Sequence, residues 1–229
     1  MWLRRLLAAA YVLREVSAHT PAEVDWDALP ERCVLQLDWR HTPEFAAVLR
    51  RHAFSVAVLV RHPLDVLVSI LQVAPHEPES ARWLDGDGGD ESSLLGADPA
   101  SPEFLEYATG PRASALLSVT PGWLPHANAV VRYADLVSDP AESLHAIAHA
   151  IPERPRPFPE HVAASVTFAG LKTPERPGLW REVMPDSVAR AIVRAQPSIA
   201  DLGFTIDSVG VSAEQARRRW AELASAVTA

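Results

Sequence analysis

The chain has 229 residues, of which 48% are hydrophobic, and it carries a formal net charge of −8. A chain of this length can bury one substantial core, and its acidic balance argues against a general nucleic-acid binder. Cys33 is the only cysteine, which excludes an intrachain disulfide or a cysteine-based zinc site and favours a reducing, cytoplasmic compartment.

Residues 1–18 superficially resemble a signal peptide, because Arg4 and Arg5 are followed by a short apolar stretch and the segment ends on small residues. The stretch is followed at once by Arg14 and Glu15, and its large apolar residues recur near a helical period. These features favour an amphipathic helix instead. No apolar run in the chain approaches the roughly 18 residues of a membrane span, so no membrane partner is expected.

Strands and helices are predicted to alternate along the rest of the chain. Residues 33–37 and 55–60 are apolar strand candidates, and residues 43–51 between them favour a helix. Residues 129–133 are a third strand candidate, and residues 139–142 then provide an acidic N-cap, a proline and a glutamate to start another helix. This alternation indicates an α/β fold with a central, mostly parallel sheet flanked by helices.

Arg61 follows the second strand candidate, and the chain then turns at once into a helix. Pro63 fits the first helical position and Asp65 the first turn, where the helix dipole favours a carboxylate. A guanidinium beside a helix N-terminus can hold an anion together with backbone N–H groups. The alternative is that Arg61 pairs with Asp65, and that Ser69 is only a small residue in a packed helix.

Two segments depart from the alternation. Residues 75–102 are rich in Gly, Pro, Ser and acidic side chains and are too long for a simple connection. They favour a mobile lid over a site, because an acidic calcium loop would need the ligand spacing and terminal glutamate of an EF-hand. Residues 152–159 contain four prolines and are predicted to form a stiff connector.

The segment from Arg61 to Ser69, RHPLDVLVS, resembles the 3′-phosphate motif of PAPS-dependent sulfotransferases. That motif is an R-x-P-x-D corner followed by a serine eight residues after the arginine. Residues 130–144, VVRYADLVSDPAESL, resemble the family's "RYEDL…DP" strand and helix, and residues 178–188, GLWREVMPDSV, resemble its "GDWKNxFT" segment. The resemblance implies one sulfotransferase-like domain over residues 1–229, with a three-layer P-loop-NTPase-like fold and residues 75–102 as an insertion.

The resemblance also implies which residues bind the co-substrate 3′-phosphoadenosine 5′-phosphosulfate (PAPS): Arg61, Ser69, Tyr133, Trp2, Lys172 and Arg176. Arg61 and Ser69 would hold the 3′-phosphate through charge-assisted hydrogen bonds. Tyr133 would lie near the nucleotide and Trp2 against the adenine, although both could equally be core residues. One of the last two cations would face the nucleotide, unless their segment is an ordinary solvated loop.

A catalytic base is expected just after the strand that precedes the Arg61 strand, where the family usually has a histidine. Asp38 occupies the nearest position and His41 follows three residues later. His41 ranks above Asp38 because its ordinary pKa is closer to neutrality. The alternatives are a turn cap for Asp38 and a surface residue for His41. His145 and His149 lack a third ligand, so no metal is expected.

The family holds the 5′-phosphosulfate with a loop of the type P-K/R-S-G-x-T-W, whose tryptophan corresponds to Trp2. The sequence contains neither this loop nor the central strand that feeds it, so the chain is expected to be truncated or to start too late, and to be a poor catalyst as written. Two functions remain: a sulfotransferase acting on a hydroxyl or amine of a small-molecule acceptor, and a non-catalytic nucleotide-binding or interaction protein that keeps the scaffold. The sequence indicates neither the acceptor nor the oligomeric state.

Overall fold

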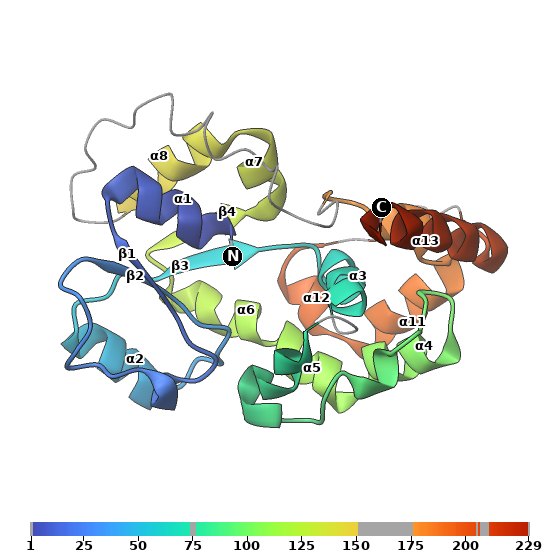
Figure 1. The fold of residues 1–229 in the computed structure, drawn as a ribbon, viewed down its shortest axis with the longest axis horizontal. Helices are drawn as coiled ribbons and strands as arrows, with labels where there is room; N and C mark the ends of the chain where they lie inside the picture. The colour runs from blue at the N-terminus through green and yellow to red at the C-terminus, as the bar shows by residue number, and fades with distance from the viewer. Residues whose placement is uncertain (1, 74–76, 151–175, 205, 207–210, 229) are drawn as a thin grey trace. The chain divides into compact units, whose positions relative to one another are not determined.

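The computed structural model describes residues 2–73, 77–150, 176–204, 206 and 211–228 (Figure 1). It is an α/β structure that divides into two compact units. Unit 1 comprises residues 1–60 and 122–170, and unit 2 comprises residues 61–121 and 171–229. The α/β class predicted from the sequence is confirmed, whereas a single domain over the whole chain stays a prediction.

The strands that the structure describes all lie in unit 1 and form two parallel pairs (Figure 1). β1 (Arg14–Ser17) pairs with β2 (Cys33–Gln36), and β3 (Ala57–Val60) pairs with β4 (Ala129–Arg132). The strands predicted at residues 33–37, 55–60 and 129–133 are therefore confirmed, each somewhat shorter than expected. β1 was not predicted, because its residues continue the apolar period of the preceding helix, and pairing with β2 overrides that local pattern.

Two helices of unit 1 begin where the sequence supplies a side-chain cap. The N-terminal helix is confirmed as α1 (Trp2–Tyr11), and the structure adds α7 (Tyr133–Ser138) directly after β4. In α2 (Pro43–Arg51) the Thr42 hydroxyl accepts the Phe45 N–H at 3.1 Å, and in α8 (Pro140–Ala150) the Asp139 carboxylate accepts the Glu142 N–H at 3.0 Å. Both are side-chain N-caps followed by proline at the first helical position, which explains why these two helices could be predicted. Three short helices are also described in this part of the chain: η1 (Pro21–Glu23), α6 (Val119–Trp123) and η4 (Leu124–His126).

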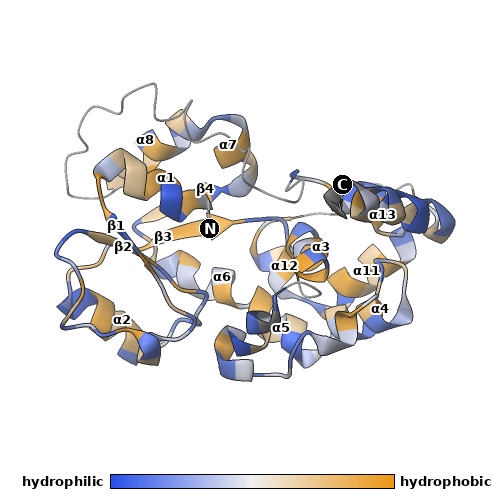
Figure 2. Cartoon of the chain, in the orientation of Figure 1, coloured by the Kyte–Doolittle hydropathy of each residue, from blue (hydrophilic) through white to orange (hydrophobic). Residues whose placement is uncertain are grey.

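The structure describes only helices and no strands in unit 2, joined by turns and loops. Its elements are α3 (Pro63–Val73), η2 (Pro78–Gly86), η3 (Ser92–Leu94), α4 (Pro102–Thr109), α5 (Pro111–Leu117), α10 (Trp180–Val183), α11 (Asp186–Ala195), α12 (Ser198–Asp201) and α13 (Ala213–Thr228). The core gathers around α3, whose Leu64 and Leu67 are fully buried with Phe104 and Trp180. Figure 2 colours β3 as mainly hydrophobic and α13 as mainly hydrophilic, in keeping with the buried strand and the largely exposed helix. None of the described helices is long and apolar enough to cross a bilayer.

The segment expected to be a lid is held by a buried arginine. Arg112, on α5, is 3% exposed and Glu91 is 2% exposed. The guanidinium donates to both carboxylate oxygens of Glu91, at 2.7 and 3.2 Å. It also donates to the carbonyls of Ser80, Trp83 and Asp87, at 3.2, 2.7 and 2.9 Å respectively. The lid stays a prediction, but the structure gives this segment an anchor that its composition did not reveal.

Candidate functional site

The candidate site is the turn from β3 into α3. His62 is the N-cap of α3, because its carbonyl accepts the first intrahelical hydrogen bond, from the Val66 N–H at 3.0 Å. The His62 side chain caps the same end, since its Nδ1 accepts the Leu64 N–H at 3.2 Å. Pro63 takes the first helical position, as predicted. The helix N-terminus, which attracts anions, therefore begins directly after Arg61.

Asp65 joins this corner to a segment more than a hundred residues away in the sequence. Its Oδ2 accepts the Gly178 N–H at 2.7 Å and its Oδ1 accepts the Trp180 N–H at 3.1 Å. The carboxylate is 2% exposed, and burial raises its pKa although both N–H groups and the charges of Arg61 and Arg181 act to lower it. The structure thus brings together residues 61–69 and 178–188, the two segments that the sequence singled out in this half of the protein.

An aromatic stack completes the corner. The His62 ring lies 4.8 Å from the Trp180 ring, tilted by 27°, and Phe204 contacts His62 at 4.7 Å. The Arg181 guanidinium lies over the Trp180 ring at 4.6 Å. Burial, together with the charge of Arg181, lowers the pKa of His62 to about 4, so its imidazole is neutral at physiological pH.

The other nucleotide-binding candidates occupy different positions. Ser69 is half-buried on α3, in the same unit as Arg61. Arg176 is exposed and forms an ion pair with Glu182, with 2.7 Å between Nη2 and Oε2. Lys172 and the side chain of Trp2 lie outside the described residues.

Tyr133 belongs to unit 1 and is 4% exposed. It follows Arg132, which is the register partner of Val60, and Val60 precedes Arg61. Tyr133 and Arg61 are thus the first residues after two paired parallel strands. The core alternative considered for Tyr133 agrees with its burial, whereas a nucleotide contact stays a prediction.

The two candidate bases also lie in unit 1, in different environments. Asp38 is exposed, two residues after β2. His41 is half-buried and stacks on His126, with 3.8 Å between ring centroids and 2° between planes, while the edge of Trp123 lies 4.8 Å away. Burial, the neighbouring His126 and Arg50 lower the pKa of His41, which keeps the imidazole in the neutral form that a general base requires. His126 was missed, because nothing in its local sequence indicates a partner 85 positions away.

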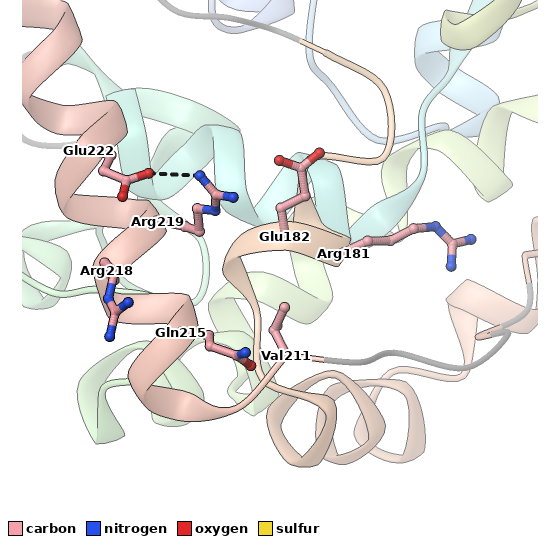
Figure 3. Close-up of a pocket in the computed structure, with 7 residues that line it drawn as sticks. All are labelled: Arg181, Glu182, Val211, Gln215, Arg218, Arg219 and Glu222. Atoms are coloured by element: carbon pink, nitrogen blue, oxygen red, sulfur yellow. Dashed lines mark hydrogen bonds and ion pairs between the residues drawn. The ribbon is translucent and has the colours of Figure 1, made fainter.

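A hollow of about 480 Å³ lies between α10 and α13 (Figure 3). Its lining residues are Arg181, Glu182, Val211, Gln215, Arg218, Arg219 and Glu222. Figure 3 shows the Arg181 side chain extending away from α13, and Arg219 is paired with Glu222 at 2.9 Å. Because these arginines do not converge on a common point, the hollow is not arranged to bind an anion.

A second hollow, of about 300 Å³, runs along β4, α7 and α8 and includes three carboxylate side chains, those of Asp135, Asp139 and Glu142. Within the described ranges, no group of three or more His, Cys, Asp or Glu side chains could hold a metal ion.

Comparison with known proteins identified no relative: no family model, no curated protein and no solved structure matches the chain. A function for it therefore has to be inferred from its residues and their geometry.

Proposed function

We propose that the chain is a sulfotransferase-like protein that binds PAPS, or its product adenosine 3′,5′-bisphosphate, through the corner from Arg61 to Ser69. The observation that carries the proposal is the pair of hydrogen bonds from Gly178 and Trp180 to Asp65. Asp65 belongs to the first of two segments that resemble motifs of one family. It accepts hydrogen bonds from the second segment, 113 residues or more away. That contact supports a common role for the two segments.

In this proposal the 3′-phosphate binds at the N-terminus of α3. Arg61 supplies a guanidinium suited to bidentate hydrogen bonding, Ser69 supplies a hydroxyl, and the helix end supplies backbone N–H groups. Asp65 does not bind the ligand but holds residues 178–180 in place. The two parallel strand pairs would belong to the mostly parallel sheet of a three-layer P-loop-NTPase-like domain, with Tyr133 near the nucleotide. The single cysteine favours a cytoplasmic location.

Sulfuryl transfer would proceed by attack of an acceptor oxygen or nitrogen on sulfur. The bond from sulfur to the oxygen that bridges it to the 5′-phosphate breaks, and adenosine 3′,5′-bisphosphate leaves. His41, neutral because its pKa is lowered, would take the acceptor proton.

The second candidate function is a nucleotide-binding or interaction protein that performs no transfer. Both candidates predict nucleotide binding, and only the first predicts sulfation of an acceptor. A transfer assay with radiolabelled PAPS and a panel of phenols, alcohols and amines separates them.

Calorimetric titration with adenosine 3′,5′-bisphosphate tests the shared claim. Replacing Arg61 by alanine should weaken binding by about 10- to 100-fold, because hydrogen bonds to charged groups contribute roughly 1.5–3 kcal/mol. The matched control is Arg190→Ala, since Arg190 is an exposed arginine paired with Asp186 on α11 and lies outside the corner. Equal affinities of the wild type and the Arg61→Ala variant would contradict the proposal.

A further inference from the structure

Two buried ring nitrogen atoms beside the N-terminus of α3 make no hydrogen bond to the described residues. They are Nε2 of His62 and Nε1 of Trp180, and neither has a partner among the described residues. The Trp180 side chain is fully buried, at 0% exposure. Buried polar groups in native proteins are nearly always hydrogen-bonded, so each exception requires an explanation.

Both nitrogens are neutral N–H donors. The His62 tautomer follows from its capping bond: Nδ1 accepts the Leu64 N–H, so the ring proton lies on Nε2. Burial and the charge of Arg181 hold the pKa of His62 near 4, which keeps the ring from gaining a second proton at neutral pH. The indole Nε1–H of Trp180 can only donate. Any group that satisfies these two atoms must therefore be a hydrogen-bond acceptor.

The two donors are fixed in position by the rest of the corner. His62 is the N-cap of α3, and the two rings stack with 4.8 Å between their centroids. The Trp180 backbone is held in turn by its N–H bond to Asp65. His62 therefore lies at the positive end of α3, next to Arg61 in the sequence, and the Trp180 ring is stacked on it. A helix N-terminus favours an anion over a neutral acceptor.

We propose that His62 Nε2–H and Trp180 Nε1–H donate hydrogen bonds to a bound oxyanion of the phosphate or sulfate class at the N-terminus of α3. With the nucleotide ligand, this oxyanion is the 3′-phosphate, and to that extent the inference rests on the proposed function. The Asp65 carboxylate accepts two backbone N–H groups, and the positive charges of Arg61 and Arg181 oppose its negative charge.

Neither nitrogen has solvent-accessible surface in this structure. An entering oxyanion must displace a neighbouring side chain, and the half-buried Phe204, whose ring centroid lies 4.7 Å from that of His62, is a candidate. Two buried N–H donors without an acceptor lower stability, which a purely structural role would not require.

The decisive variant is Trp180→Phe, which keeps an aromatic ring and removes only the N–H donor and part of the ring surface. We expect it to weaken binding of adenosine 3′,5′-bisphosphate about tenfold, and the melting temperature of the ligand-free protein measures separately what the smaller buried ring costs. His62→Phe should weaken binding by a similar factor. The matched control is Trp220→Phe, on α13, which should leave the affinity unchanged.

A second readout does not depend on affinity or on how stable the variants are. In the 15N spectrum of the wild type, the indole N–H signal assigned to Trp180 should move downfield when inorganic sulfate or the bisphosphate is added, and the Trp220 signal should not. Unchanged affinity in both variants would overturn the inference, and so would an unmoved Trp180 signal at saturating ligand.

The outcomes separate the inference from the proposed function. If Arg61→Ala abolishes bisphosphate binding while Trp180→Phe and His62→Phe bind normally, the inference fails and the proposed function stands. If sulfate or phosphate moves the Trp180 signal but the nucleotide binds no better than free phosphate, the inference stands and the proposed function fails. If the wild type binds none of these anions, both fail.

Discussion

Removing the Arg112 side chain should strongly destabilise unit 2. The guanidinium makes five hydrogen bonds, two to the Glu91 carboxylate and three to backbone carbonyls between residues 80 and 87. Tyr107 also donates its hydroxyl to Glu91, at 3.0 Å. Arg112→Met would leave a buried carboxylate without its cation. Breaking a buried ion pair in this way typically costs about 3–5 kcal/mol.

Urea denaturation measures that loss, and hydrogen exchange locates it. Amides of residues 80–91 should lose protection in Arg112→Met, because this segment is held by the guanidinium. The double variant Arg112→Met with Glu91→Leu should recover much of the stability, since no uncompensated charge remains buried. A loss below about 1 kcal/mol for the single variant, or a double variant at least as unstable as the single one, would refute this account of the segment.

Three further predictions concern the candidate site. His126→Phe should raise the pKa of His41 toward its ordinary value, because the stacked ring is kept and its charge removed, and an NMR titration that shows no rise would contradict this. The pKa of His62 is lowered from 6.5 to about 4, so the unfolded chain takes up a proton at higher pH than the folded chain does. The free energy of unfolding should therefore be highest above pH 6.5 and should decrease by roughly 3 kcal/mol as the pH falls toward 4. Urea denaturation at several pH values checks this, and His62→Phe should flatten the dependence; an equal slope in both proteins would count against it. Asp65→Ala should release the backbone N–H groups of residues 178–180 at a cost of about 1–3 kcal/mol, measured by the same denaturation and by faster exchange of these amides, and unchanged exchange would show that the bonds do not hold the segment.

Local sequence signals predicted the elements that carry their own caps. Thr42 followed by Pro43, and Asp139 followed by Pro140, satisfy the first helical N–H groups from within a few residues, so the starts of α2 and α8 could be predicted. β1 could not, because Arg14 and Glu15 are polar and the strand exists only through pairing with β2. Short parallel strands depend on partners distant in sequence, which local patterns do not specify.

In the candidate site, too, the local helix start could be predicted and the contacts between distant residues could not. The order Arg61, Pro63, Asp65 predicted a helix start beside a cation, and the structure has the helix beginning at Pro63. The sequence did not indicate that Asp65 would accept two N–H groups from residues 178–180, nor that His62 would stack on a tryptophan of that segment. These contacts join residues more than 110 positions apart, and they arise from the packing of the core of unit 2.

His126 and Arg112 were missed for a related reason. A single histidine after a short helix and a single arginine in a helix have no distinctive spacing. Their importance comes from what they contact, the His41 ring in one case and the buried Glu91 carboxylate in the other. Burial of its charge is the signal that identifies Arg112, and the ring stack on His41 is the signal that identifies His126; both become visible only in the folded structure.

The central claim is that the corner at Arg61 recognises a nucleotide through its 3′-phosphate. Calorimetric titration of the wild-type protein with adenosine 3′,5′-bisphosphate and with adenosine 5′-monophosphate tests it most directly, since the two ligands differ only in that phosphate. We expect the bisphosphate to bind at least about tenfold more tightly, a difference of about 1.4 kcal/mol. Equal affinity for the two nucleotides, or no binding of either, would contradict the claim.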